Sequence, residues 1–279
     1  MTTYHALRGA CGLLLVLLLL IMPLPARGYV LMGEHILDRM VQALGRAETL
    51  SASQTLSLHD EIPPLPSPVS LTETVYLRRP NAFRSEASGG GHTRKVLLTD
   101  GAALMAVDGV LQREPPPRYI RYHDVLILKP RQALVDYLIQ LGIDVTVSSL
   151  GRSEDTYCYV VGARFPDENA PQLWVAKDTF LPFRLMLPPS DLRPGSGPVE
   201  IRYRNWTFVD DAAYPLHVVT SENHQVMQEI RVDRVQVNPV LPQDAFDAAA
   251  FRSAHARPSP DDGPGRPSPA EDILLPGIE

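Results

Sequence analysis

The chain has 279 residues, a length that predicts one large domain or at most two. Apolar residues make up 44% and charged residues 21%, which excludes both a disordered chain and a multi-span membrane protein. The formal net charge of −6 argues against electrostatic binding of nucleic acid, which needs a basic face. Two cysteines are too few for a disulfide framework or a cysteine-based zinc site.

The N-terminal stretch is predicted to be a signal peptide. An apolar run of ten residues, Leu13 to Met22, follows Arg8. A membrane-spanning helix needs about 20 apolar residues, so the run fits the core of a signal peptide better than an uncleaved anchor, which is the alternative. Small residues at Ala26 and Gly28 mark two candidate cleavage positions. We therefore assign residues 1–28 to a signal peptide and expect an exported mature protein.

Two amphipathic helices are predicted from the spacing of apolar residues. The first lies within residues 31–49, where apolar side chains recur every three or four positions. The second covers residues 130–142. Pro130 lies at its first turn and Gly142 ends it, in keeping with the preferences of helix termini.

Most of the remaining middle of the chain alternates apolar and polar residues with a period of two, the pattern of antiparallel strands. The pairs Asp100-Gly101 and Asp108-Gly109 separate apolar runs and predict tight hairpin turns. In the last long strand the alternation shifts near Asp233 or Arg234, which predicts a β-bulge. We expect about ten strands in one large curved antiparallel sheet. They cover residues 53–58, 69–79, 95–99, 102–107, 110–112, 144–150, 156–165, 172–177, 181–187, 199–209 and 226–237.

No catalytic motif is present in the sequence. It lacks a Gly-x-Ser-x-Gly elbow, a Walker loop, a dinucleotide fingerprint and a His-Glu-x-x-His metal motif. The pairs His59-Asp60 and His123-Asp124 stand alone in the sequence and form no metal-binding or acid–base motif. The pair Asp210-Asp211 is typical of a solvated turn. Cys158 is interpreted as a buried, inert thiol. The sequence therefore predicts a protein that is not an enzyme and needs no metal or cofactor.

Arg79 interrupts an apolar row. It shares strand parity with Val75 and Leu77 and stands at the end of their row. One interpretation is an edge arginine whose stem packs while its head reaches water. The other is an arginine at the mouth of a cavity, bonded to helix or loop carbonyls and holding a lid shut.

The C-terminal segment is predicted to be a disordered tail. From Ala254 to Glu279 the chain is rich in proline, glycine, serine and acidic residues. Its end, Ile273 to Ile278, is either a docking peptide or, as we expect, a frayed terminus. The folded domain is accordingly expected to cover residues 29–253.

The middle of the chain resembles the LolA-like superfamily, the periplasmic carriers of outer-membrane lipoproteins. The resemblance covers residues 29–247 and rests on six features. These are the helix HILDRMVQAL, the strand ASQTLSL, the segment VYLRRPNAF from Val75 to Phe83, the hairpin VLLTDGAALMAV, the segment RYRNWTFVDDAAYPLHVV, and the closing pattern of Asn238, Leu241, Pro242 and Phe246. The proline-rich loop of residues 63–68 and the tail depart from the family pattern.

The resemblance implies a mainly β (α+β) fold: an unclosed antiparallel barrel, or curved sheet, with helices packed as a lid over its concave face. It implies that Arg79 contacts this lid and that Val75, Leu77 and Phe83 line a cavity for acyl chains. Such a protein would be a periplasmic monomer. It would carry lipoprotein or lipid acyl chains from an inner-membrane release complex to an outer-membrane acceptor. The alternative is a regulatory or scaffolding module of the envelope that binds a protein partner, and a cavity filled by side chains would favour it.

Overall fold

The computed structural model describes residues 30–99, 101–127, 130–189 and 196–256. The chain divides into two compact units, Met1–Leu31 and Met32–Glu279, and every element described below belongs to the second unit. The predicted signal peptide, residues 1–28, and most of the predicted tail lie outside the described residues. No helix among the described residues is long and apolar enough to cross a membrane.

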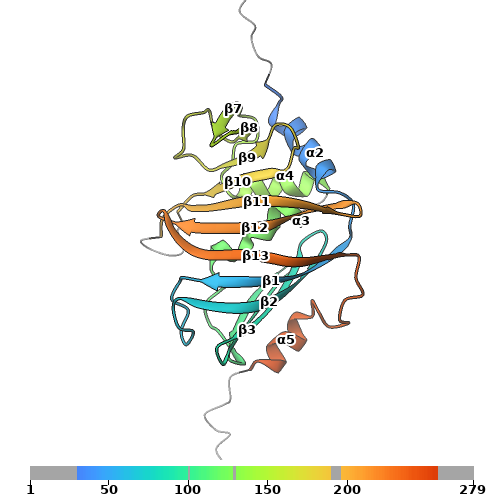
Figure 1. Cartoon of the computed structure of the whole chain (residues 1–279), viewed down its shortest axis with the longest axis vertical. Coiled ribbons are helices and arrows are strands. Elements are labelled where there is room, and N and C mark those ends of the chain that lie inside the picture. Colours follow the sequence, from blue (N-terminus) through green and yellow to red (C-terminus); the bar gives the residue numbers. More distant parts are fainter. Residues whose placement is uncertain (1–29, 100, 128–129, 190–195, 257–279) are drawn as a thin grey trace, which may run out of the picture. The chain divides into compact units, whose positions relative to one another are not determined.

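The second unit is dominated by strands (Figure 1). Its helices are α2 (Gly33–Ala43), the 3₁₀ helix η1 (Arg118–His123), α3 (Asp124–Ile127), α4 (Arg131–Gln140) and α5 (Ala248–Ala254). Its strands are β1 (Thr49–Leu58), β2 (Val69–Arg78), β3 (Ala82–Gly89), β4 (His92–Thr99), β5 (Ala102–Val107), β6 (Val110–Leu111), β7 (Ser148–Ser153), β8 (Thr156–Val161), β9 (Gln172–Ala176), β10 (Pro182–Leu187), β11 (Val199–Val209), β12 (Ala212–Glu222) and β13 (Gln225–Val237).

All described strands form one antiparallel sheet. Its 13 strands follow the order β6-β5-β4-β3-β2-β1-β13-β12-β11-β10-β9-β8-β7. The end strands β6 and β7 do not pair with each other within the described residues, so the sheet is not closed into a barrel. Helices α3 and α4 lie behind the central strands in Figure 1. The predicted mainly β fold, an unclosed curved antiparallel sheet with few helices, is confirmed.

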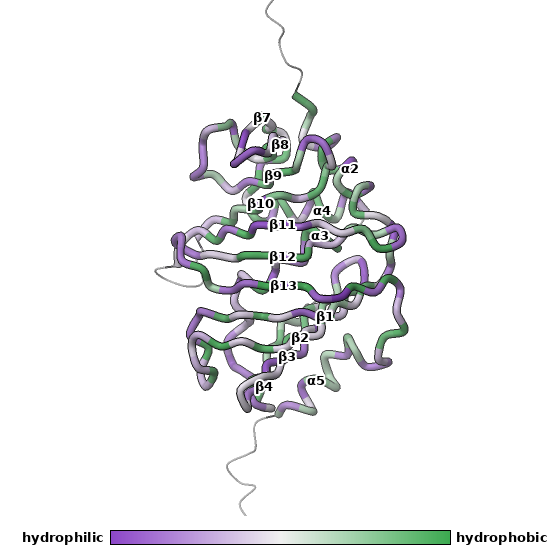
Figure 2. The backbone as a smooth tube through the Cα atoms, in the orientation of Figure 1, coloured by the Kyte–Doolittle hydropathy of each residue, from purple (hydrophilic) through white to green (hydrophobic). Residues whose placement is uncertain are grey.

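Two local predictions for the sheet are also confirmed. Gly101 and Gly109 lie in the turns after β4 and β5, with φ angles of +77° and +79° that glycine adopts without steric cost. Between β1 and β13, Ser53 pairs with Arg234 and Gln54 with Val232, so Asp233 is the extra residue of a bulge. Figure 2 shows hydrophilic and hydrophobic segments alternating along the strands.

Some element boundaries differ from the prediction. Helix α2 ends at Ala43 rather than near residue 49, because Gly45 has a φ of +82°, a left-handed conformation that stops the helix. Strand β7 begins at Ser148 rather than at residue 144. The Asp144 carboxylate accepts hydrogen bonds from the backbone N–H and the hydroxyl of Thr146, which makes a turn.

Strands β3 and β12 are absent from the predicted set. Strand β12 follows the predicted turn at Asp210-Asp211 and contains Pro215, which argues against a central strand. Pro215 pairs with Trp206 of β11, whereas the pairing of β12 with β13 covers only His217 to Glu222, beyond Pro215. The missing N–H of the proline therefore removes no bond of that pairing.

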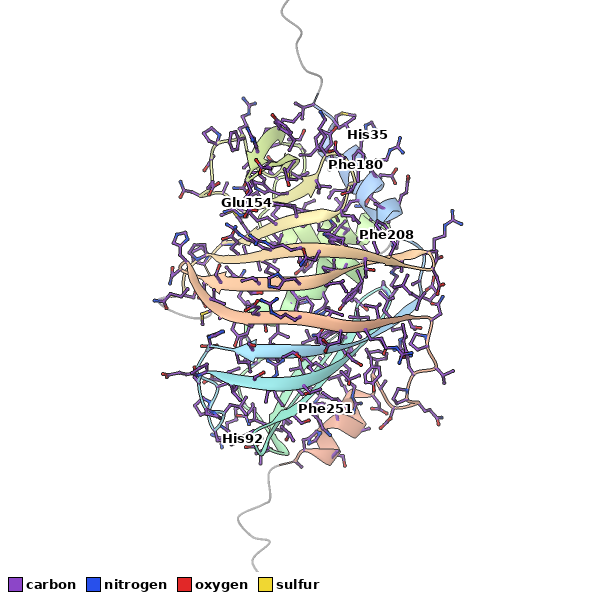
Figure 3. The ribbon with its side chains drawn as sticks, viewed as in Figure 1. His35, His92, Glu154, Phe180, Phe208 and Phe251 are labelled. Atoms are coloured by element: carbon purple, nitrogen blue, oxygen red, sulfur yellow. The ribbon has the colours of Figure 1, made fainter. Side chains whose placement is uncertain are left out.

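Helix α5 covers one end of the sheet on the face opposite to η1. The Asp247 carboxylate caps its N-terminus by accepting from the backbone N–H groups of Ala249 and Ala250. Phe251 of α5 packs against Leu97 and Ala106 of β4 and β5 (Figure 3). Ala254, where the predicted tail starts, is thus the last residue of a packed helix. The backbone N–H of Leu111 donates to the carbonyl of His255 over 2.8 Å.

Candidate functional site

The predicted lining residues lie together on the inner face of the sheet, which we define as the face that carries them. Leu77 of β2 pairs with Phe83 of β3, and Val75 lies two residues earlier on the same face. The exposed fractions of Val75, Leu77 and Phe83 are 0%, 1% and 1%. The His123 ring stacks on Phe83, with ring centroids 3.8 Å apart and planes inclined by 8°. These residues are therefore covered by other side chains and do not line an open cavity.

The rings that cover Phe83 come from η1, and we call η1 and α3 together, residues Arg118 to Ile127, the plug segment. Most of its side chains are buried, including those of Tyr119, Tyr122 and Ile127. The Tyr203 hydroxyl of β11 donates to the carbonyl of Tyr122 over 2.7 Å, and the Gln228 amide of β13 donates to that of Tyr119 over 3.0 Å. A short 3₁₀ helix leaves carbonyls without internal partners, and polar side chains of the sheet satisfy two of them here.

A buried polar cluster interrupts the apolar inner face. Arg94 of β4 and Glu73 of β2 form an ion pair over 2.9 Å, and each side chain is 2% exposed. The amide of Gln54 donates to Glu73 over 2.6 Å, and the Ser85 hydroxyl also donates to Glu73. Gln54 further contacts the hydroxyl of Tyr122 at 3.2 Å, which ties the cluster to the plug segment. The sequence carried one signal for it: Glu73 stands between Leu71 and Val75 in the row that ends at Arg79.

A second charged cluster lies on the plug segment. Asp124 accepts from Nε of Arg121 over 2.7 Å, and Nε2 of His123 lies 3.1 Å from its other oxygen. Burial alone would raise the pKa of Asp124, but the charges of His123 and Arg121 outweigh it and hold this pKa below the usual value. His123-Asp124 is thus part of a network and not an isolated pair. No group of three or more metal-ligating side chains occurs in the described part of the chain.

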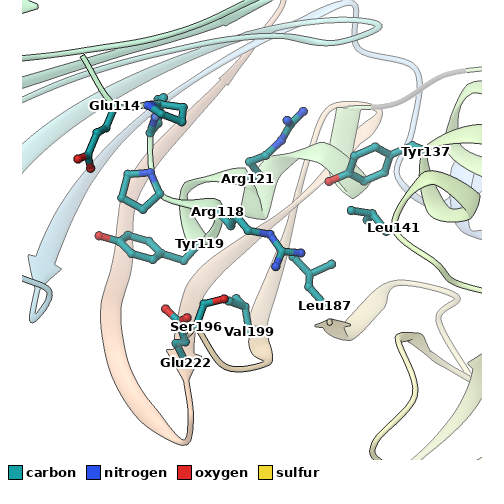
Figure 4. Close-up of a pocket in the computed structure, with 13 residues that line it drawn as sticks. Glu114, Arg118, Tyr119, Arg121, Tyr137, Leu141, Leu187, Ser196, Val199 and Glu222 are labelled. Atoms are coloured by element: carbon teal, nitrogen blue, oxygen red, sulfur yellow. The ribbon is translucent and has the colours of Figure 1, made fainter. Parts of the chain in front are cut away.

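Two cavities flank the plug segment. Cavity 1 has a volume of about 610 Å³ and lies between the plug segment, the end of α4 and strands β10 and β11 (Figure 4). Cavity 2 has a volume of about 640 Å³ and lies between α3, α4 and the β4–β5 hairpin. Both volumes fall within the range of about 300–1,000 Å³ typical of small-molecule sites. Cavity 1 is lined by Glu114, Pro115, Pro116, Pro117, Arg118, Tyr119, Arg121, Tyr137, Leu141, Leu187, Ser196, Val199 and Glu222.

Arg79 lies beside the end of α2. Its Nη1 donates to the carbonyl oxygen of Gly45 over 3.3 Å, whereas Nε and Nη2 are buried without a hydrogen-bond partner. Burial lowers the pKa of Arg79, and the nearby carboxylates of Glu48 and Asp211 oppose this effect. Arg79 also lines a third cavity of about 430 Å³. The contact with a carbonyl matches the second of the two interpretations of this arginine, while its role toward a lid stays a prediction.

The fold and the site together describe a curved antiparallel sheet whose inner face is covered by helices and flanked by cavities. The sequence matches no family model and no curated protein. Solved structures with a similar fold include a LolA superfamily protein from Nitrosomonas europaea, with 12% identity, a TM-score of 0.49 and coverage of 79% of this chain and 100% of that one. A putative outer-membrane lipoprotein-sorting protein domain from Vibrio parahaemolyticus has 9% identity, a TM-score of 0.49 and coverage of 79% and 98%. A DUF1329 family protein from Desulfovibrio piger has 12% identity, a TM-score of 0.48 and coverage of 78% and 97%.

Proposed function

We propose that this protein is an exported, non-enzymatic carrier that binds the acyl chain of a lipoprotein or another amphiphile in cavity 1. The observation that carries the proposal is the cavity itself. Apolar side chains from four different elements, Tyr119, Leu141, Leu187 and Val199, meet around it. Burying an acyl chain contributes about 0.8 kcal/mol per methylene, so such a site holds cargo without covalent chemistry.

The proposed site differs from the one that the sequence predicts. Val75, Leu77 and Phe83 are fully buried, so the acyl chain is assigned to cavity 1, on the side of the plug segment that faces β10 and β11. Charged groups, among them Arg118 and Glu222, also line cavity 1. In this proposal the carrier works as a monomer in the periplasm, between a release complex of the inner membrane and an acceptor at the outer membrane.

The test combines extraction and binding. Protein purified from its native envelope should yield about one acyl-bearing lipid per chain by mass spectrometry, and the delipidated protein should bind dansylundecanoic acid. Leu141→Trp, at the residue that follows α4, fills cavity 1 and should weaken this binding about tenfold or more, because the ring takes the place of several methylenes. Ile139→Trp is the matched control, since Ile139 lies on the same helix, is 54% exposed and does not line the cavity. A wild-type protein that carries no lipid and does not bind the probe would refute the carrier.

A second candidate function is a regulatory or scaffolding module that binds a protein partner. It is favoured by one observation: the His123 ring of the plug segment stacks on Phe83, so a side chain and not a cavity lies against this part of the inner face of β3. The same extraction separates the two candidates. A module of this kind, when purified from the envelope, would carry a stoichiometric protein partner and no lipid.

A further inference from the structure

Cavities 1 and 2 share a wall. Arg121 of η1 and Tyr137 of α4 line both cavities, and the guanidinium carbon of Arg121 lies 5.9 Å from the centroid of the Tyr137 ring. Figure 4 shows both side chains at the edge of cavity 1. Only these two residues are common to the two linings within the described part of the chain, so they form a thin partition.

The partition is formed in part by a half-exposed side chain, that of Arg121. The backbone of η1 is kinked at Arg121, with φ −79° and ψ 22°, and the Arg121 side chain is 49% exposed. Its Nε is held by the buried carboxylate of Asp124 over 2.7 Å, which keeps the stem in place while the far end faces the cavities. Because the guanidinium is planar and rigid, connecting cavity 1 to cavity 2 requires the whole group to swing away, which breaks its bond to Asp124 but does not require the backbone of the plug segment to move.

The two compartments differ in chemistry. The Tyr119, Leu187 and Val199 side chains make cavity 1 largely apolar, whereas cavity 2 presents the hydrogen-bonding groups of Thr99, Asp136 and Gln140. Among the described residues that line cavity 2, the ionic side chains are one arginine, Arg121, and two aspartates, Asp124 and Asp136, which together carry a net charge of −1. The net charge of these described lining residues is negative even with Arg121 included, so they disfavour an anionic head group. Uncharged hydroxyl groups, in contrast, can donate to Asp136 and accept from Gln140.

We infer that the two cavities are compartments of one site for an amphiphile with a single acyl chain and an uncharged, hydroxyl-bearing head group. The acyl chain lies in cavity 1, the head group lies in cavity 2, and the two join between Arg121 and Tyr137. This inference rests on the proposed function, because it assigns the acyl chain to the same cavity. It goes further in naming the head group that the protein prefers.

The test measures head-group preference by displacement of dansylundecanoic acid. The competitors are 1-monooleoylglycerol and oleoyl lysophosphatidylglycerol, which carry the same acyl chain on an uncharged and an anionic head. The wild-type protein should bind 1-monooleoylglycerol about tenfold more tightly, the size of one hydrogen bond to a charged group. Ala133→Phe fills cavity 2 from α4 and should abolish this preference while leaving the affinity for dansylundecanoic acid within about twofold. Ile139→Phe, on the exposed side of α4, is the control and should keep the preference.

The outcomes separate the two proposals. Equal affinities for the two lipids, or a preference that survives Ala133→Phe, would overturn the two-compartment site while leaving an acyl carrier in place. Failure of the wild-type protein to bind dansylundecanoic acid or either lipid would overturn both proposals.

Discussion

Arg79 and Gly45 join strand β2 to the end of helix α2: Nη1 of Arg79 donates to the carbonyl oxygen of Gly45 over 3.3 Å. Gly45 lies two residues beyond the last residue of α2, where backbone carbonyls lack helical partners and the helix dipole favours a cation. The arginine thus meets the partial negative charge of this helix end. We expect substitution of Arg79 and substitution of Gly45 to have different effects.

Replacing Arg79 tests its proposed role at a lid. Arg79→Leu removes the bond to Gly45 but also removes two buried N–H groups that lack partners, so we expect a change in stability of no more than about 1 kcal/mol. The variant should fold and bind dansylundecanoic acid, but should transfer it to acceptor vesicles more slowly than the wild type. The control is Arg78→Leu, because Arg78 is exposed and lies on the opposite face of β2. Transfer by Arg79→Leu at the rate of the wild type would leave this arginine without a role in the handover.

Replacing Gly45 tests the packing at the same junction. A Cβ atom at Gly45 would lie 1.5 Å from the carbonyl oxygen of Asp211, and the φ of +82° is itself unfavourable for alanine. Gly91 has a φ of +84° but nothing within 4 Å of its added Cβ, so it isolates the conformational cost. Gly91→Ala should cost about 1 kcal/mol, and Gly45→Ala at least about 2 kcal/mol more, in urea-induced unfolding. Similar losses in the two variants would show that the backbone at Asp211 moves away freely.

Because Glu73 and Arg94 form a buried ion pair, we expect the effects of substituting these two residues on the free energy of unfolding to be strongly non-additive. Glu73→Leu alone leaves the Arg94 charge buried without its partner and should cost about 3–5 kcal/mol of unfolding free energy. Adding Arg94→Met removes that charge, and the double variant should recover most of the loss. The pair of Arg152 and Asp155 is exposed, so Arg152→Ala should cost less than about 1 kcal/mol. A double-mutant cycle without coupling between positions 73 and 94 would contradict this prediction.

Asp124 predicts a loss of stability in acid. Its folded-state pKa is held below the value of an unfolded aspartate, because the charges of His123 and Arg121 outweigh burial, which acts in the opposite direction. The carboxylate therefore stabilises the fold above about pH 4, and this contribution is lost as the pH falls through the lowered folded-state pKa. The unfolding free energies of the wild type and Asp124→Asn should differ most near pH 7 and converge below about pH 4. Asp136→Asn, at an exposed position of α4, is the control. A difference that does not vary between pH 7 and pH 3 would show that Asp124 acts by packing alone.

The sequence by itself determined the features that depend on neighbouring residues. Asp-Gly pairs set the hairpins at Gly101 and Gly109, a shift in alternation placed the bulge at Asp233, and Pro130 and Gly142 bracketed helix α4. Alternation with a period of two also placed Val75 and Leu77 on the buried face of β2. These features are local because turn chemistry and side-chain period act over a few residues, whatever the rest of the chain does.

Only the tertiary structure decided what covers that buried face and where space remains. The plug segment has no regular apolar period, and it is held in place by Tyr203 and Gln228, about 80 and 110 residues further along the chain. The position of Phe83 against His123 likewise depends on how far the sheet curves before η1 meets it. The walls of cavity 1 come from η1, α4, β10 and β11, and no pattern in any one of these segments encodes their distance from the others. Packing between distant segments follows from the pairing and curvature of the whole sheet, which is why the cavity lies beside the plug segment and not beneath it.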